Sequence, residues 1–242
     1  MKDLNIIITM AGLGSRFRNA GYPCPKYMIK AKGRSLFEWS LESLSGLNSY
    51  VIKYIFIVRK EDNAESFIRE KVKRLGITNF EIVAIDFLTD GQATTCLLAE
   101  KYCDIDKKLL VYNIDTYVEK GELNYSIATH DGSIPCFIAE GDHWSFVKVD
   151  SLGNIREVKE KVRISKYCSI GAYYFSTFDL FKKLYTEYYA YNSITNNKEK
   201  YIAPLYDLMI RKGMQVKMVL INSDKVHVLG TPEELNEFEK VK

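Results

Sequence analysis

The chain has 242 residues, of which 47% are hydrophobic, so it is long enough to bury one sizeable core. A single α/β domain is a normal outcome at this length. The 34 basic and 31 acidic residues give a net charge of only +3, which excludes a global basic field that would favour nucleic acid or an anionic membrane surface. Any recognition of phosphate must therefore be local.

The sequence shows no sign of a membrane or export segment. No run reaches the roughly eighteen consecutive apolar residues of a transmembrane helix, and the first apolar run, Ile6 to Ile8, is too short for a signal peptide. The five cysteines are widely spread without a CxxC pair, and the three histidines are scattered. We therefore expect a soluble cytoplasmic protein with free thiols and no zinc site, and homo-oligomerisation is left open.

Apolar runs and helical patterns alternate over the first half, which predicts repeated strand–helix–strand units. Ser35, followed three residues later by Glu38, forms a capping box at the start of the first long helix. The last apolar run is too hydrophobic to be half solvated, so a parallel sheet buried on both faces is predicted. We expect strands at 4–9, 51–59, 80–85 and 109–114, and helices at 35–47, 61–75 and 93–103.

After Asp115 the pattern changes to short alternating stretches, which are typical of a mixed or antiparallel extension of the sheet. The expected strands are 134–140, 146–149, 155–158, 169–175 and 216–221, with helices at 177–189, 202–212 and 232–241 and a polar loop at 192–200. The predicted fold is therefore α/β. It is a single-domain three-layer sandwich with a mostly parallel, Rossmann-like central sheet and a small antiparallel extension.

Ligands of such sheets bind outside the carboxyl ends of the parallel strands, so the loops that begin at Met10, Phe87 and Asp115 should converge. The first loop reads Met-Ala-Gly-Leu-Gly-Ser-Arg-Phe over residues 10–17, with Pro-Lys at 25–26. Its glycines let backbone amides approach phosphates, while Arg16 and Lys26 supply positive charge. A P-loop would end in Gly-Lys-Ser/Thr, and a dinucleotide fingerprint would need a small residue at position 17.

This loop resembles the NTP-binding loop of the sugar-phosphate nucleotidyltransferases, also called nucleoside-diphosphate-sugar pyrophosphorylases. Their pattern is Gly-x-Gly-x-Arg, an apolar residue and then, about ten residues on, a Lys that often follows Pro. Ala11, Gly12 and Gly14 are accordingly expected to contact the nucleotide. The resemblance further implies that Arg16 grips the leaving pyrophosphate and that Lys26 contacts the α-phosphate.

Further matches follow in the family's order through nearly the whole chain. They also imply a Gly-Thr-Pro-Glu helix start at 230–233. The implied site residues are Gly91, which packs under the nucleoside, Asp115, which holds Mg²⁺, Lys161, which meets the acceptor phosphate, and Gly171, which belongs to the acceptor-site strand.

Each downstream match also has a structural interpretation. Asp115 could cap a turn after its strand, although its place beside the phosphate loop favours a metal. Lys161 lies in a charged run that is nearly as compatible with a solvated face, and Gly171 could be a strand bulge.

Three positions depart from the family pattern. Val228 stands where an Asp usually completes the metal site, so Asp115 would act with the triphosphate, and Asp224 is a weak substitute. Val162 replaces the proline after Glu-Lys. Asp86 stands near a base-reading Gln and predicts a preference for CTP, because a carboxylate accepts from the amino group of cytosine. Base recognition by the backbone of residues 10–12 is the competing interpretation.

The sequence therefore predicts a nucleotidyltransferase that joins NMP from an NTP to a sugar 1-phosphate and releases pyrophosphate. Residues 1–118 are expected to bind the NTP and residues 119–242 the acceptor. Cytidylyl transfer to a phosphorylated alditol, choline or amino acid derivative is the alternative within enzymes. A glycosyltransferase would need an Asp-x-Asp motif, of which residues 113–115 are half, and Val228 is the feature that favours a non-catalytic nucleotide-binding regulator.

Overall fold

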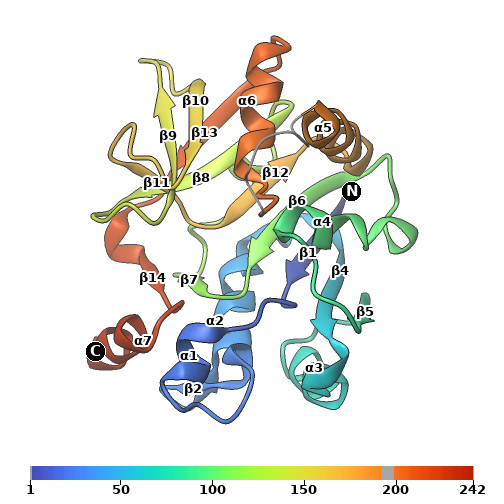
Figure 1. The fold of residues 1–242 in the computed structure, drawn as a ribbon, viewed down its shortest axis with the longest axis vertical. Helices are drawn as coiled ribbons and strands as arrows, with labels where there is room; N and C mark the ends of the chain where they lie inside the picture. Colours follow the sequence, from blue (N-terminus) through green and yellow to red (C-terminus); the bar gives the residue numbers. More distant parts are fainter. Residues whose placement is uncertain (1, 192–198, 242) are drawn as a thin grey trace.

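Within residues 2–191 and 199–241, which the computed structural model describes, ten strands form one mixed sheet (Figure 1). The strand order is β10-β9-β11-β8-β12-β6-β1-β4-β5, and β13 pairs with β8 beside this path. The first half of the chain forms the parallel part of the sheet, which consists of β6 (Lys108–Asn113), β1 (Lys2–Thr9), β4 (Tyr50–Arg59) and β5 (Phe80–Ile85).

The antiparallel extension continues the same sheet beyond β6. It consists of β12 (Ala172–Phe175), β8 (Gly132–Ile138), β11 (Tyr167–Ser169), β9 (Ser145–Val149) and β10 (Ile155–Glu160), while β13 (Val216–Leu220) runs parallel to β8. The predicted α/β class is confirmed, and the extension is wider than the sequence suggested. The single strand expected at 169–175 is two strands, because Gly171 has a φ of 79°.

Helices cover both faces of the sheet, as the alternation along β1 requires. Leu4, Ile6 and Ile8 share a hydrophobic cluster with α2 (Leu36–Glu42) and α3 (Glu65–Arg74). Ile7 points the other way, into a cluster with α4 (Gln92–Leu97), α5 (Phe178–Tyr191) and α6 (Ala203–Arg211). Each such aliphatic side chain stabilises the fold by about 1.5–3 kcal/mol when fully buried. The predicted three layers are confirmed.

All six predicted helices exist, and all except α5 are shorter than expected. The capping box of α2 is present, since the Ser35 Oγ accepts from the Glu38 N–H at 3.3 Å and the Glu38 carboxylate accepts from the Ser35 N–H at 2.9 Å. The rest of the segment expected at 35–47 is a 3₁₀ turn, Ser43–Leu47. Helix α3 begins late because Asn63, with a φ of 47°, separates it from the 3₁₀ turn Lys60–Asp62.

A third cluster brings the C-terminal helix α7 (Pro232–Lys240) back to the N-terminal loop region. Phe238 and Leu235 of α7 pack with Phe17 of α1 (Ser15–Asn19) and Ala31 of the β2–β3 hairpin (Lys30–Ala31 and Arg34–Ser35). The approach is fixed by a separate antiparallel pair, β7 (Thr116–Val118) with β14 (Val226–Val228). Figure 1 shows α7 beside α1 and the hairpin, far along the chain but close in space. This return places residues 228–234 at the site.

Two further features bear on the sequence predictions. All five cysteines are free. Most of the polar loop expected at 192–200 lies outside the described residues. No helix in the described ranges is long and apolar enough to cross a membrane.

Candidate active site

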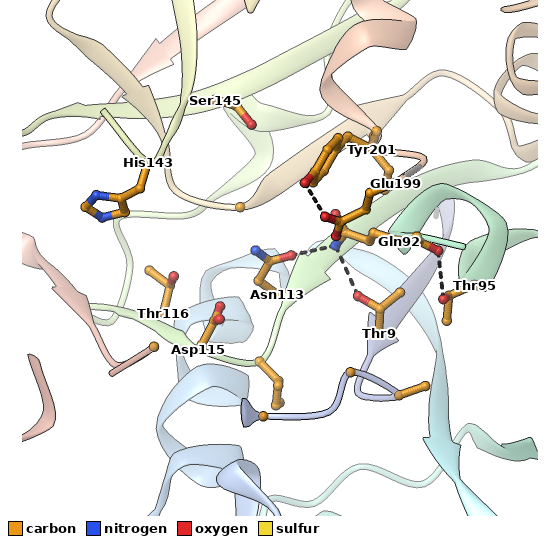
Figure 2. Close-up of a pocket in the computed structure, with 18 of the residues that line it drawn as sticks. Thr9, Gln92, Thr95, Asn113, Asp115, Thr116, His143, Ser145, Glu199 and Tyr201 are labelled. Atoms are coloured by element: carbon orange, nitrogen blue, oxygen red, sulfur yellow. Dashed lines mark hydrogen bonds between the residues drawn. The ribbon is translucent and has the colours of Figure 1, made fainter. Parts of the chain in front are cut away.

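A cavity of about 800 Å³ opens at the carboxyl ends of the parallel strands. Its walls come from the loops after β1, β5 and β6, so the three loops expected to converge do so, and residues of the antiparallel half close the opposite side. Figure 2 shows Asp115, Thr116 and Asn113 at the end of β6, across from Ser145 and Tyr201.

Eight of the ten residues predicted for the site line this cavity. They are Ala11, Gly12, Gly14, Arg16, Lys26, Gly91, Asp115 and Gly171. Lys161 and Asp86 are the two outside the lining. The roles of these ten residues in binding the nucleotide, the metal and the acceptor stay predictions. The cavity is the place where these substrates would bind.

The loop after β1 presents its backbone to the cavity. Gly14 has a φ of 62°, and a Cβ there would lie 3.9 Å from the Cβ of Lys26, so the two loops are in close contact. Among the described residues, the N–H groups of 12–15 donate to no acceptor. Adjacent amides without acceptors form a concave donor surface that suits an anion such as a phosphate.

Two cations flank these amides, and their surroundings differ. The Arg16 side chain is exposed and has no ion pair within the described part of the chain. The Lys26 Nζ lies 2.7 Å from the Asp115 Oδ2, and both side chains are about a quarter exposed. Lys26 is therefore held at the predicted metal ligand, while Arg16 is free to meet an incoming phosphate.

Gly91 allows close packing between α4 and the segment 199–201. It has a φ of 146°, and a Cβ there would lie 2.4 Å from the backbone N of Lys200. The contact is held by hydrogen bonds from the Ala93 N–H to the Lys200 carbonyl at 3.0 Å and by the Lys200–Asp90 ion pair at 2.8 Å. This use of Gly91 is additional to the nucleoside contact that the sequence suggested.

Gly91→Ala is expected to destabilise the protein by about 1–3 kcal/mol, because alanine strains this backbone and collides with Lys200. Urea denaturation gives the free energy of unfolding. Gly76→Ala is a matched control, since Gly76 also has a positive φ, of 70°, but open space around it. Equal losses in the two variants would contradict a role for the Lys200 contact.

The floor of the cavity is a polar network that the sequence did not indicate. The Gln92 Nε2 donates to the Thr9 Oγ1 at 3.1 Å and to the Asn113 Oδ1 at 2.6 Å (Figure 2). Gly171 lies against it, because a Cβ there would be 2.4 Å from the Asn113 Nδ2. Asn113 and Gly171 belong to segments that the sequence singled out, but the hydrogen bonds that join Asn113, Gln92 and Thr9 have no sequence pattern, because the three residues come from different strands and a helix.

The opposite end of the cavity offers a carboxylate and hydroxyls. Glu160 accepts a short hydrogen bond from the Ser145 hydroxyl, which also lies 2.9 Å from the Tyr173 hydroxyl. Burial raises the pKa of Glu160, partly offset by the Ser145 hydrogen bond and the charge of Lys161. Such a group accepts hydrogen bonds from hydroxyls.

Lys161 lies at the rim of this end and does not enter it. Its backbone φ is 56°, and its Nζ donates to the Tyr201 hydroxyl at 2.6 Å. That hydrogen bond raises the pKa of Lys161. The Tyr201 hydroxyl donates in turn to Glu199, so a phosphate contact would require Lys161 to leave this group.

Asp86 is exposed and lines a separate hollow with Arg59, Phe87 and Leu88. Leu88 also lines the main cavity, but the Asp86 carboxylate does not.

The donors present suit a hard divalent cation. The described residues contain no group of three or more His, Cys, Asp or Glu side chains that could hold a metal by themselves. Asp115, however, is a cavity carboxylate already paired with a cation, and Mg²⁺ commonly binds one or two carboxylates together with substrate phosphates and water. Val228 lines the cavity without a ligand atom, whereas Asp224 is exposed and outside the lining.

Solved structures share this fold, although no family model and no curated protein matches the chain. An inositol-1-phosphate CTP transferase from T. maritima has 16% identity and a TM-score of 0.75, covering 98% of this chain and 94% of that one. A CTP:phosphocholine cytidylyltransferase from Streptococcus pneumoniae has 17% identity and a TM-score of 0.75, covering 98% of each. The fold is therefore that of nucleotidyltransferases.

A solved structure with higher sequence identity shows the family to which the chain belongs. The nucleoside-diphosphate-sugar pyrophosphorylase from Vibrio cholerae RC9 is 36% identical, with a TM-score of 0.90, and the match covers 98% of this chain and all of that one. The chain belongs to the sugar-phosphate nucleotidyltransferase family, the nucleoside-diphosphate-sugar pyrophosphorylases, and is a nucleotidyltransferase.

Proposed function

We propose that this enzyme transfers NMP from an NTP to a sugar 1-phosphate in the presence of Mg²⁺ and releases pyrophosphate, in the cytoplasm. The observation that carries the proposal is the polarity of the cavity. One wall holds free amides and the cations Arg16 and Lys26, and the far end holds Glu160 with the hydroxyls of Ser145 and Tyr173. The first wall suits a triphosphate, and the far end suits an acceptor that bears hydroxyls.

The two halves of the chain divide the work. Residues 1–118 bind the NTP and residues 119–242 the acceptor, apart from Val228, Gly230 and Glu234, which line the cavity close to Asp115 at the end of β6. Both halves share one sheet and a hydrophobic cluster, so the two substrates would bind to neighbouring parts of the same sheet edge.

The chemistry needs no general base. An acceptor phosphate oxygen, anionic at pH 7, attacks the α-phosphorus in line, and the bond from that phosphorus to the pyrophosphate oxygen breaks. Lys26 stabilises the charge on the α-phosphate and Arg16 the charge on the departing pyrophosphate. Mg²⁺ bound at Asp115 would neutralise phosphate charge. His143 and Ser145 both line the cavity, but within the described residues no histidine is hydrogen-bonded to a serine or a cysteine, which agrees with a reaction that needs no activated nucleophile.

Glu160→Gln is expected to raise the KM for the acceptor by about tenfold or more while leaving the KM for NTP unchanged, because hydrogen bonds to a charged group contribute about 1.5–3 kcal/mol. Steady-state kinetics measure both constants. Glu157→Gln on the same strand is the control, since Glu157 does not line the cavity. A larger effect on the NTP would contradict an acceptor role.

The raised pKa of Glu160 allows its proposed role in acceptor binding to be tested by varying the pH. Because burial raises its pKa, the carboxylate gains a proton at a higher pH than an ordinary glutamate when the pH falls. The KM for the acceptor should therefore rise on the acid side in the wild type, and this rise should be absent from Glu160→Gln.

The preference for CTP stays a prediction, and its original basis, Asp86, lies outside the cavity lining. Recognition by the backbone of residues 10–12 accounts for a preference without Asp86. We therefore expect Asp86→Asn to leave the order of the four nucleotides unchanged, as measured by calorimetry. A changed order would give Asp86 the role that the sequence first suggested.

Pyrophosphate release from each NTP with a panel of phosphorylated acceptors tests the function. A sugar 1-phosphate should support the fastest release. Faster release with a phosphorylated alditol, phosphocholine or a phosphorylated amino acid derivative would favour the alternative acceptors.

A further inference from the structure

A second carboxylate, that of Glu234, lies beside Asp115 in the cavity. Both residues line the cavity. A Cβ placed on Gly230 would lie 3.4 Å from the Glu234 Oε2 and 3.5 Å from the Asp115 Oδ2. The two oxygens are therefore at most about 7 Å apart, and Gly230 has no side chain that would occupy the space next to both of them.

The backbone fixes this approach. Val228 of β14 pairs with Thr116 of β7, and the Leu229 N–H donates to the Asp115 carbonyl at 2.8 Å. Gly230 is thereby held against Asp115, and α7 starts immediately afterwards. The Thr231 hydroxyl caps the helix by accepting from the Glu234 N–H at 3.1 Å.

The Glu234 side chain reaches past its own helix start. Its Oε2 accepts from the Gly230 N–H at 3.0 Å, and the carboxylate has no ion pair within the described residues. Lys26 already neutralises Asp115. Lys26 is therefore the cation in contact with this pair of carboxylates, and within the described residues the Glu234 carboxylate has no ion pair, although Arg16 also lines the cavity.

We propose that Glu234 is the second carboxylate of the Mg²⁺ site, at the position where Val228 supplies no ligand. The inference rests on the proposed function. Asp115 approaches from the end of β6 and Glu234 from the first turn of α7, so the ion would be held between the two halves of the chain. One or two carboxylates with phosphate oxygens and water form the set that Mg²⁺ commonly uses.

The test measures metal binding directly, with Mn²⁺ as the probe in the presence of saturating inorganic pyrophosphate. Pyrophosphate is the product of every NTP, so the identity of the nucleotide does not enter. Electron paramagnetic resonance, read against a blank of Mn²⁺ and pyrophosphate without protein, gives the fraction of Mn²⁺ bound to the enzyme. Glu234→Gln keeps an oxygen that can accept from the Gly230 N–H, so the variant should fold with an unchanged melting temperature.

We expect Glu234→Gln to weaken Mn²⁺ binding by at least about tenfold, because affinity follows the number of charged ligands. Glu233→Gln, the exposed neighbour outside the lining, should bind Mn²⁺ as the wild type does. Wild-type affinity in Glu234→Gln together with a loss in Asp115→Asn would overturn the role of Glu234 and leave the proposed function intact. Wild-type affinity in both variants would overturn the metal site itself.

Discussion

Asp115→Asn is expected to abolish the Mg²⁺-dependent activity while leaving the fold intact. Asparagine keeps the shape of the side chain but removes the charge that a hard cation requires. It also releases Lys26 from an ion pair whose members are each about a quarter exposed, and pairs of this kind contribute at most about 1 kcal/mol. Turnover at millimolar Mg²⁺ and thermal denaturation measure the two effects.

Asp224→Asn is the matched control for that variant. Asp224 is an exposed aspartate outside the cavity lining, so its loss should leave turnover unchanged. If Asp115 only caps the turn after β6, Asp115→Asn will remain active, and the metal must then bind elsewhere.

Lys26→Ala is expected to lower turnover by roughly a hundredfold to a thousandfold, the usual cost of removing one preorganised group that faces developing charge. The Lys26 Nζ is held by Asp115 on the NTP side of the cavity, next to the free amides of the loop after β1. Lys30→Ala, at an exposed position outside the lining, provides the control. Turnover within a few-fold of wild type in folded Lys26→Ala would remove Lys26 from the mechanism.

The contact between Lys26 and Asp115 has a consequence for the double variant. Groups in direct contact rarely act independently, so the losses of thermal stability in Lys26→Ala and Asp115→Asn should not add when the two are combined. Additive losses would indicate that the ion pair is not maintained in solution.

Local patterns predicted the parts of this structure that depend on near neighbours in the chain. Apolar runs that alternate with helical patterns located β1, β4, β5 and β6, and the Ser35–Glu38 pair located the start of α2. The function of the loop after β1 could be predicted because a purely structural turn does not explain glycines that are followed by both Arg16 and Lys26.

Contacts between distant segments could not be predicted from the sequence, because they depend on how the strands pair in space. Glu234 has the ordinary signature of a helix start, and its carboxylate reaches the cavity only because β14 pairs with β7. Lys161 lies outside the lining and its Nζ donates to the Tyr201 hydroxyl, a contact forty residues away along the chain that no local pattern predicts. Gly91 was noticed for a nucleoside contact, but its closest neighbour is the backbone of Lys200.

The most direct test of the proposed reaction is to follow an ¹⁸O label placed in the phosphate of the sugar 1-phosphate, with phosphorus NMR of the products. If the acceptor oxygen attacks the α-phosphorus, all of the label will remain in the nucleoside diphosphate sugar, and one unlabelled pyrophosphate will form for each product molecule. Label in pyrophosphate or in free phosphate, or release of pyrophosphate without any acceptor, would contradict the account.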